Sequence, residues 1–548
     1  MDPKTTGTQE PYVVETKSHD AELQPERKHS ITGDVFLHDH GAETELRRIL
    51  STRHLTMIAL GSSIGMGLWL GSGSSLIKGG PAGIFLGYVL SGFMIWSVSH
   101  SIGEMAVMYP LPSAFVQWSG KFIDPAWGFA VGWAYWFNFV ITIANELQAA
   151  NTVLRFWTTD VHVAAWMVIW FVVIVAVNVG AVTVFGEIEV IASTIKFSWI
   201  FVVIISCIVI SAGGGPVDEG YPIGFRYWNS TPFTHGFKGF LAVMPTCIFA
   251  MAGSENAGLV AAETANPKKS VPRAVGSIWI RLATFYLMGS LMVTITVSPF
   301  EEDLFGGTGT NASPFVIAYR NAGIPVLAHF MNAIILLSVI STGTISGYAG
   351  ARTAMGLAYL GMAPQQFKKA DKLGRPWWAL VPTLTVGFGL AFLNVSEDGK
   401  TIFGWFSSLT SCFTLFGWGM ICLSHIRMRK AWKLQGRRVE DLPWKTWTWP
   451  YGAWFGFITC VILLGVLFYL AVWPLGVTPN AEDFWASYIS VPLILVLYII
   501  GKVIYKTPFL VDLKTVDLDY GRRFYAEDVE KSGKKGNVAV RGLKSFFK

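Results

Sequence analysis

The chain has 548 residues, of which 52% are hydrophobic and only 14% are charged. Apolar runs of about 20 residues recur along it, which is typical of membrane-spanning helices and excludes an ordinary water-soluble domain. The formal net charge of +6 does not indicate a nucleic-acid-binding protein, because Lys and Arg gather beside the apolar runs. The sequence also contains no nucleophile elbow, metal-ligand cluster or phosphate-binding loop, so we do not expect an enzyme.

Twelve apolar runs are predicted to be membrane-spanning helices. They lie near residues 55–75, 83–108, 126–153, 163–182, 188–212, 238–262, 274–298, 326–349, 379–395, 402–426, 452–474 and 484–505. Residues 1–46 are polar and lack the apolar core of a signal peptide, so we predict a disordered N-terminal tail. The membrane domain is predicted to cover residues 47–505, and the polar residues 506–548 are predicted to form a C-terminal tail.

The loops between the apolar runs alternate in charge. Lys and Arg concentrate after the sixth, eighth and tenth runs, at 268–273, 368–375 and 427–445, whereas the intervening loops carry acidic pairs such as Glu301 and Glu302. Because basic loops stay on the cytoplasmic side of a membrane, this alternation predicts that both termini are cytoplasmic. The protein is therefore expected to be a multi-pass protein of the lipid bilayer.

The first apolar run, "IALGSSIGMGLWLGSG" at 58–73, is unusually rich in glycine and serine. Each glycine inside a helix costs about 1 kcal/mol relative to alanine. Small residues at this spacing are common where membrane helices pack closely, which is the simplest interpretation of one such run. The sixth run repeats the pattern in "FAMAGSENAGLVAAE" at 249–263. Two such segments, five runs apart, favour a break in each helix.

A helix broken in mid-membrane frees amide and carbonyl groups that lipid cannot satisfy, so the break must line a cavity. Amides at a half-helix N-terminus suit a carboxylate, and freed carbonyls suit an ammonium group. Two facing breaks therefore suit a zwitterion such as an α-amino acid. The spacing also predicts two inverted halves, at 55–212 and 238–426, followed by two extra helices within 452–505.

Several longer motifs identify a family resemblance. They are "GSSIGMGLWLGSG" (61–73), "SIGEMA" (101–106), "NELQAANTVLRFW" (145–157), "FGEIEVIASTIK" (185–196), "FAMAGSENAGLVAAETANPKKSVPRAV" (249–275) and "VDLDYGRR" (516–523). With these residues the sequence resembles the fungal amino-acid permeases, the yeast amino acid transporter branch of the amino acid–polyamine–organocation superfamily, from about Arg47 to Arg523. The resemblance implies an all-α polytopic membrane protein with twelve transmembrane helices, arranged as a LeuT-type 5+5 inverted repeat with discontinuous helices 1 and 6.

The implied activity is proton-coupled symport that imports amino acids across a fungal plasma membrane by alternating access. The proton gradient would be the energy source, with no bound cofactor or metal. A ubiquitin ligase or its adaptor would act on the cytoplasmic tails. An amino-acid sensor, or transceptor, of the same fold with little transport remains the alternative.

The resemblance also implies a substrate site at the two breaks. The substrate carboxylate would meet backbone amides from Ile64 to Gly67, and its ammonium would meet carbonyls in both breaks. Phe249 would close over the substrate as a gate, and a threonine in the eighth run would lie near the substrate side chain. The implied substrate-binding residues are Ser63, Ile64, Gly65, Met66, Gly67, Phe249, Ala252 and Thr344.

Three charged residues are candidates for coupling and gating. Lys196 lies about eight residues into the fifth run, where it could be functional or could extend to the cytoplasmic interface. The resemblance implies that its ammonium replaces the sodium ion of related carriers. Glu255 is an equal candidate for the transported proton, or a buried acid that holds the second break. Glu146 is implied in substrate preference or coupling, with a water-facing position in an outer vestibule as the alternative.

Two departures from the family pattern concern specificity. Met66 and Thr344 stand at positions where the family commonly has threonine and asparagine. These changes make the predicted pocket less polar and favour neutral or broad-range amino acids as substrates. A polyamine or choline carrier would need no carboxylate-binding amides, so the run from Ile64 to Gly67 disfavours it. Glu187 and Glu189 are expected to make contacts at a cytoplasmic helix end.

Overall fold

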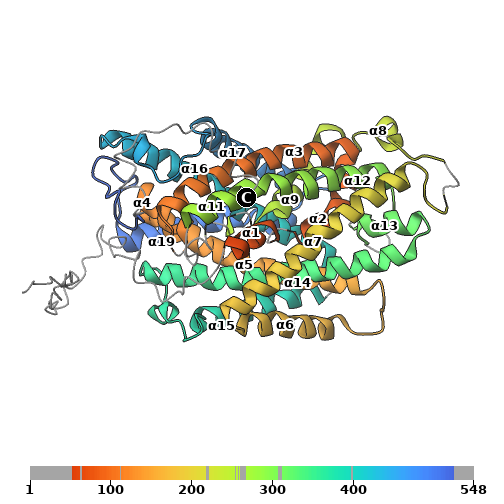
Figure 1. Ribbon diagram of the computed structural model, residues 1–548, viewed down its shortest axis with the longest axis horizontal. Helices are drawn as coiled ribbons and strands as arrows, with labels where there is room; N and C mark the ends of the chain where they lie inside the picture. Colours follow the sequence, from red (N-terminus) through yellow and green to blue (C-terminus); the bar gives the residue numbers. More distant parts are fainter. Residues whose placement is uncertain are drawn as a thin grey trace, which may run out of the picture.

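The computed structural model describes residues 52–61, 64–111, 113–217, 221–253, 255–256, 258, 267–305, 312–395 and 399–523. In these residues every extended regular element is a helix, and most of the helices run along the long axis of one elongated bundle (Figure 1). Helices α4 and α19 lie at one end of the bundle and α8 and α13 at the other. The short helices α1 and α2 and the helix α9 lie near the middle of this view.

The first apolar run is interrupted, as its glycines predict. Helix α1 (Thr52–Gly61) ends before Ile64, and α2 (Met66–Trp69) begins after Gly65, whose backbone is extended at φ −140° and ψ −151°. Helix α3 (Gly71–Met108) continues the chain after a single turn residue. The run therefore has two helical parts on either side of residues 64–65.

Helix α3 combines the end of the first run with the whole second run. The two parts are joined at Gly80, whose φ of 72° is in the left-handed region, and Pro81 follows it. The N–H of Ala82 is satisfied outside the helix, by the carbonyl oxygen of Pro232 at 2.9 Å. A glycine is required here because other L-residues rarely adopt this backbone conformation.

The sixth run is interrupted too. Helix α9 (Gly236–Met251) ends where Ala252 leaves the helical conformation, at φ −57° and ψ 151°. Gly253 follows with a φ of 96°. The two residues together turn the chain out of the helical path. Both predicted breaks are thus present, at 64–65 and 252–253.

Most of the remaining helices overlap the predicted runs, whereas the short helices α4, α8 and α13 lie between them and α7 begins six residues before its predicted run. Their bounds are α4 (Ala114–Phe122), α5 (Pro125–Leu154), α6 (Val163–Val179), α7 (Val182–Ser211), α8 (Arg226–Ser230), α11 (Pro267–Arg281), α12 (Gly289–Thr296), α13 (Pro314–Asn321), α14 (Pro325–Tyr359), α15 (Trp377–Ala391), α16 (Gly399–Leu434), α17 (Tyr451–Val472), α18 (Ala481–Tyr488) and α19 (Ser490–Tyr505). A π-helical segment, Leu282–Met288, joins α11 to α12.

Within the described residues, seven helical spans are long and apolar enough to cross a membrane, and the pair α18 and α19, bent by 55°, is an eighth. The other predicted spans are short or interrupted: α6, α9, α15 and the first run. A helix of 16 residues, such as α9, is about 24 Å long, less than the roughly 30 Å hydrocarbon core of a bilayer. Length and composition therefore establish a multi-span helical membrane protein but not the full count of twelve.

The interrupted segments pack inside the bundle. Helix α14 runs along α5, and α9 runs along α3. Helix α1 contacts α7 and α11, and α2 contacts α9. The most apolar windows of α7 and α17 are only 33% buried, against 78% for α16, so α7 and α17 present apolar side chains outward, as helices facing lipid do.

The C-terminal strap, which we define as residues 506–523, crosses one end of the bundle. The N–H of Val511 donates to the carbonyl of Ile123 at 2.9 Å, and the N–H of Arg523 donates to the carbonyl of Met108 at 3.0 Å. The hydroxyl of Tyr109 donates to the carbonyl of Leu518 at 2.7 Å. The strap thus connects the end of α3 to the start of α5.

Candidate functional site

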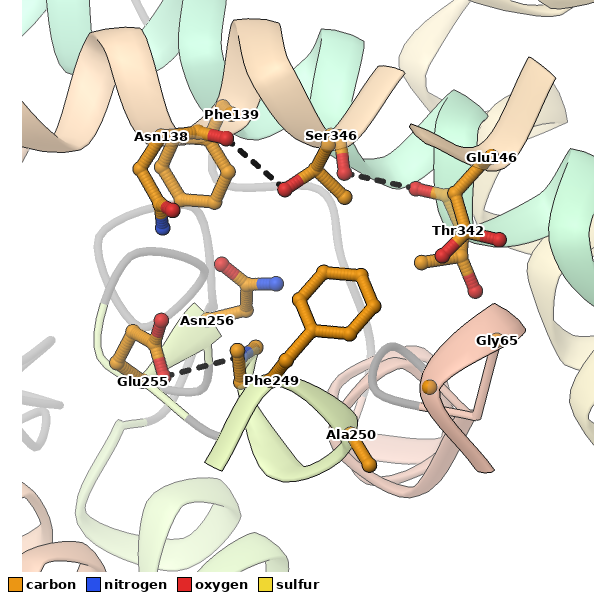
Figure 2. Close-up of a pocket in the computed structure, with 14 residues that line it drawn as sticks. Gly65, Asn138, Phe139, Glu146, Phe249, Ala250, Glu255, Asn256, Thr342 and Ser346 are labelled. Carbon is orange, nitrogen blue, oxygen red and sulfur yellow. Dashed lines mark hydrogen bonds between the residues drawn. The ribbon is translucent and has the colours of Figure 1, made fainter. Parts of the chain in front are cut away.

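A cavity lies where the two interrupted helices meet α5 and α14 (Figure 2). Its volume is about 30 Å³, which is room for no more than a few water molecules. The cavity is lined by Gly65, Gly67, Asn138, Phe139, Thr142, Glu146, Phe249, Ala250, Ala252, Gly253, Glu255, Asn256, Thr342 and Ser346. Sequence reasoning placed six of these at the site: Gly65, Gly67, Glu146, Phe249, Ala252 and Glu255.

The backbones of the two breaks approach each other closely. A Cβ atom on Gly67 would lie 2.6 Å from the Cα of Ala250, so only glycine fits at this position. Phe249 is 6% exposed, and its ring lies among the side chains that line the cavity in Figure 2. The carbonyl of Ala250 accepts a hydrogen bond from the hydroxyl of Tyr286 at 2.6 Å. The second break therefore already has one of its carbonyls satisfied.

Glu146 lies at the first break. Its side chain is 2% exposed, and Oε2 accepts a hydrogen bond from the N–H of Met66 at 3.2 Å. The alternative that Glu146 faces water in an outer vestibule is wrong, because α5 carries it into the protein interior. The Glu146 carboxylate is therefore hydrogen-bonded to the Met66 amide, one of the backbone amides that we expect to bind the carboxylate of a substrate.

Lys196 lies at the carbonyl side of the same break. Its ammonium Nζ is 3.3 Å from the carbonyl oxygen of Gly61 and 3.4 Å from that of Ile64. It also donates to Oγ of Ser341 at 2.9 Å, and the residue is 0% exposed. Lysine here neutralises carbonyls at the C-terminal, electronegative end of α1.

Helix α7 begins earlier than the predicted fifth run, so Lys196 lies further from the start of its helix than expected. Helix α7 begins at Val182, so Lys196 lies 14 residues into it, about 21 Å from its start. We predicted Lys196 to lie eight residues into the span, because the polar "FGEIE" segment indicates a position outside the membrane. The buried ammonium also excludes the alternative in which the lysine extends to the cytoplasmic interface.

Ser341 connects Lys196 to a second buried acid. The hydroxyl of Ser341 donates to Oε2 of Glu189 at 2.7 Å, and Glu189 is 0% exposed. Its neighbour Glu187 has a side chain that is 51% exposed and pairs with Arg53 at 2.6 Å. Both acids make contacts near the start of α7, but Glu187 does so at the surface and Glu189 in the protein interior. The signal for Glu189 was its seven-residue spacing from Lys196, which places both on one helix face.

Glu255 holds the second break. Its Oε2 accepts hydrogen bonds from the N–H of Gly253 at 3.1 Å and from Nε1 of Trp418 at 3.0 Å. These contacts match the alternative in which the acid stabilises the broken backbone. Figure 2 shows Glu255 and Asn138 on one side of the view, and Glu146 and Thr342 on the other. The cavity therefore has one end near the first break and another near Glu255.

Thr344 does not line the cavity. Its hydroxyl donates to the carbonyl of Ile340 at 2.8 Å, and its own carbonyl accepts from Asn178 at 3.1 Å. Thr342 and Ser346, two residues away on either side, line the cavity instead. Two residues are about 200° of rotation around a helix, so a threonine at 344 faces away from the cavity wall.

Of the other predicted backbone positions, Ser63 lies outside the described residues. The carbonyl of Ile64 accepts from Oγ1 of Thr342 at 3.1 Å as well as facing Lys196. The side chain of Met66 is buried, and its amide is the one that contacts Glu146. At the first break, the carbonyls of Gly61 and Ile64 and the N–H of Met66 are thus held by a cation, a hydroxyl and a carboxylate.

This arrangement offers peptide groups and neutral polar side chains to a small polar molecule. It also joins the Lys196 ammonium to the Glu189 carboxylate through the hydroxyl of Ser341. No three His, Cys, Asp or Glu side chains come together as metal ligands in the part of the chain that the structure describes.

A protein-family model described as "Amino acid permease" matches residues 54–514 of the chain. An uncharacterized amino-acid permease of Schizosaccharomyces pombe is 40% identical over 94% of this chain and 92% of its own length. The cationic amino acid transporter 1 of the same yeast is 40% identical over 92% of this chain and 86% of its own length. The general amino-acid permease GAP2 of Candida albicans is 40% identical over 88% of this chain and 82% of its own length.

Proposed function

Since the chain belongs to the amino acid permease family, we propose that it is a proton-coupled symporter that imports amino acids by alternating access. In this proposal the chain crosses the plasma membrane twelve times, with both termini in the cytoplasm. Its two halves form a LeuT-type inverted repeat around the cavity.

The observation that carries the proposal is the position of the Lys196 ammonium. It contacts two carbonyls of the first break, those of Gly61 and Ile64. A fixed side-chain cation therefore supplies the positive charge that the freed carbonyls need, and no cation from solution is required there. An ammonium within a network of buried carboxyl groups can lose and regain a proton, which makes the proton the natural coupling ion.

The position of Glu146 explains how binding of a proton and binding of the substrate could be coupled. In its charged form the carboxylate occupies the N–H of Met66, where the substrate carboxylate would bind. Two carboxylates cannot share this site without strong repulsion, so substrate binding requires Glu146 to be protonated or displaced. Protonation of Glu146 would free the Met66 amide and let one proton and one amino acid bind as a pair.

The cavity walls favour neutral or broad-range substrates. The walls carry the neutral polar side chains of Asn138, Thr142, Asn256 and Ser346, and Glu255 lies at the end away from the first break. The one acid at this end, Glu255, already accepts two hydrogen bonds. A relative is named a general amino-acid permease, which agrees with a broad range.

The test is uptake of each of the twenty radiolabelled amino acids by a permease-deficient yeast that expresses the chain, with and without a proton uncoupler. We expect accumulation of several neutral amino acids that the uncoupler abolishes. Accumulation that ignores the uncoupler would overturn the coupling. Amino-acid-dependent signalling without measurable uptake would favour the sensor.

A further inference from the structure

We propose that Ser341 and Glu189 form a relay that takes the transported proton from Lys196 toward the cytoplasmic end of α7. This inference rests on the proposed proton coupling and names the residues that complete it. Neither residue lines the substrate cavity, so their role would be separate from substrate binding.

The relay is a continuous chain of hydrogen bonds with one direction. Nζ of Lys196 donates to Oγ of Ser341 at 2.9 Å, and the hydroxyl of Ser341 donates to Oε2 of Glu189 at 2.7 Å. Both distances are in the range of ordinary hydrogen bonds. Lys196, Ser341 and Glu189 are buried, at 0%, 7% and 0% exposure respectively. Bulk water therefore does not compete for the protons of these hydrogen bonds.

Helix geometry explains why the two charged ends can be joined by one hydroxyl. Glu189 and Lys196 are seven residues apart on α7, which is two turns and about 10 Å along one face. Helical side chains lean toward the N-terminus, so Lys196 extends back toward Glu189. Ser341, on α14, lies between them. Since α7 is predicted to begin on the cytoplasmic side, the acid lies on the cytoplasmic side of the lysine.

The transfer is balanced in atoms and charge. An N–H bond of the Lys196 ammonium breaks while an O–H bond forms at Oγ of Ser341. At the same time the original O–H bond of Ser341 breaks and an O–H bond forms at Oε2 of Glu189. An ammonium, a hydroxyl and a carboxylate become an amine, a hydroxyl and a carboxylic acid, so no external reactant is needed.

Glu189 is suited to hold this proton for a short time. Its second oxygen, Oε1, has no hydrogen-bond partner among the described residues. A buried carboxylate with an unpartnered oxygen is costly, and a proton removes most of that cost. When the cytoplasmic half of the protein opens, water would reach Glu189 and take the proton away.

The competing view is that Glu189 only balances the charge of Lys196. A counter-ion would be needed in every step of transport, whereas a relay is needed only for net proton release. Exchange of internal for external substrate involves no net proton release, because the carrier returns loaded. The two views therefore differ in their prediction for a variant without the relay. If Glu189 is part of a relay, exchange persists and accumulation is lost; if it is only a counter-ion, both are lost.

The experiment uses the full chain in proteoliposomes and measures two rates: accumulation driven by an imposed proton gradient, and exchange of labelled for unlabelled substrate. The substrate is the amino acid best accumulated in the uptake screen. The variants are Ser341→Ala, which removes the relay hydroxyl, Ser341→Thr, which keeps it, and Glu189→Gln. Thr353→Val is the matched control, since Thr353 is a buried residue of the same helix whose hydroxyl donates to the helix backbone, at Ala349.

We expect Ser341→Ala to reduce gradient-driven accumulation by about tenfold or more while exchange stays within about twofold of the wild type. Ser341→Thr and Thr353→Val should retain both activities, and Glu189→Gln should resemble Ser341→Ala. Wild-type accumulation in Ser341→Ala, or equal loss of exchange and accumulation, would overturn the relay. Wild-type accumulation that ignores the proton gradient would instead overturn the proposed function.

Discussion

The Lys196 ammonium is buried away from solvent, and such a charge is tolerated only when partners replace its hydration. Its partners come from two other helices, at Gly61 on α1 and Ser341 on α14. A residue with this position stabilises the first break and also carries charge. Substitution of Lys196 can separate its stabilising role at the first break from its role in carrying charge.

We predict that Lys196→Ala abolishes accumulation of amino acids while the protein still reaches the cell surface. Lys196→Arg keeps a positive charge, but a guanidinium does not release its proton in proteins. The arginine variant should therefore also lose uphill accumulation. The measurement is uptake normalised to surface-labelled protein, and normal accumulation in Lys196→Arg would show that this group does not exchange the coupling proton.

The sequence identified residues by type and motif more reliably than by orientation. Phe249 and Glu255 were placed correctly at the second break, because a motif fixes their order along the backbone. Thr344 was placed at the cavity incorrectly, because the rotation of α14 against α5 decides which of its residues line the cavity. The burial of Glu146 depends on the same packing, which no local pattern encodes.

Among the elements, the two interrupted helices depend on backbone contact with each other. A methyl group at Gly67 would overlap the backbone at Ala250, which cannot move without displacing α9. Helix α2 has only four residues, so it has little packing of its own to resist displacement.

We therefore predict that Gly67→Ala abolishes uptake and lowers the thermal stability of the purified protein. Gly276→Ala is the matched control, because a Cβ at that helical position meets nothing within 4 Å. It should keep full uptake and gain up to about 1 kcal/mol from helix propensity. Uptake by Gly67→Ala at the wild-type rate would contradict the close approach of the two breaks.

The breaks themselves could be predicted, because two glycine-rich stretches inside apolar runs, at repeat spacing, favour interrupted helices over close packing alone. The start of α7, in contrast, could not be predicted. Its first turns contain Gly186, Glu187 and Glu189, which a hydropathy reading assigns to a loop. The helix extends through them because Glu189 is buried against α14 while Glu187 faces outward.

At the scale of the whole molecule, the C-terminal strap joins parts of the bundle that are far apart in sequence. Arg437 makes two hydrogen bonds to the Asp519 carboxylate, at 2.6 and 2.5 Å. Gln435 donates to the carbonyls of Leu513 and Val516. The hydrogen bond from Arg437 holds the pKa of Asp519 below its usual value.

We predict that the double variant Gln435→Ala and Arg437→Ala increases hydrogen–deuterium exchange of residues 508–523. Arg438→Ala is the control, since its side chain is 74% exposed and pairs with the nearby Asp441. Because a lowered acid pKa stabilises the docked strap above the normal pKa of Asp, the protection of these amides, corrected for the intrinsic exchange rate at each pH, should not change between about pH 5 and 8. Lower protection of these amides at pH 5 than at pH 8 in the wild type would contradict this ion pair.

The orientation of the molecule also has a direct test. The five native cysteines are all buried, so added cysteines can be labelled selectively. We predict that Glu302→Cys reacts with a membrane-impermeant maleimide in intact cells, whereas Lys372→Cys reacts only after permeabilisation. Both positions are exposed loop residues, which makes them a matched pair. The reverse pattern would contradict cytoplasmic termini.

Charge distribution allows this prediction because it acts on whole loops and needs no knowledge of packing. The number of spans is harder to establish from length and composition. Helices such as α6, α9 and α15 are short because they end at turns or breaks inside the protein, where neighbouring helices can shield their ends.

The small volume of the central cavity has a consequence for the cell that carries this protein. A chamber of about 30 Å³ cannot hold a continuous column of water across a membrane. If the protein is the proposed symporter, a cavity of this size gives small ions no conducting path in this conformation, and the voltage across the membrane would be preserved between transport cycles. In the proposed symporter, the membrane potential would then be dissipated only when a proton and a substrate cross together.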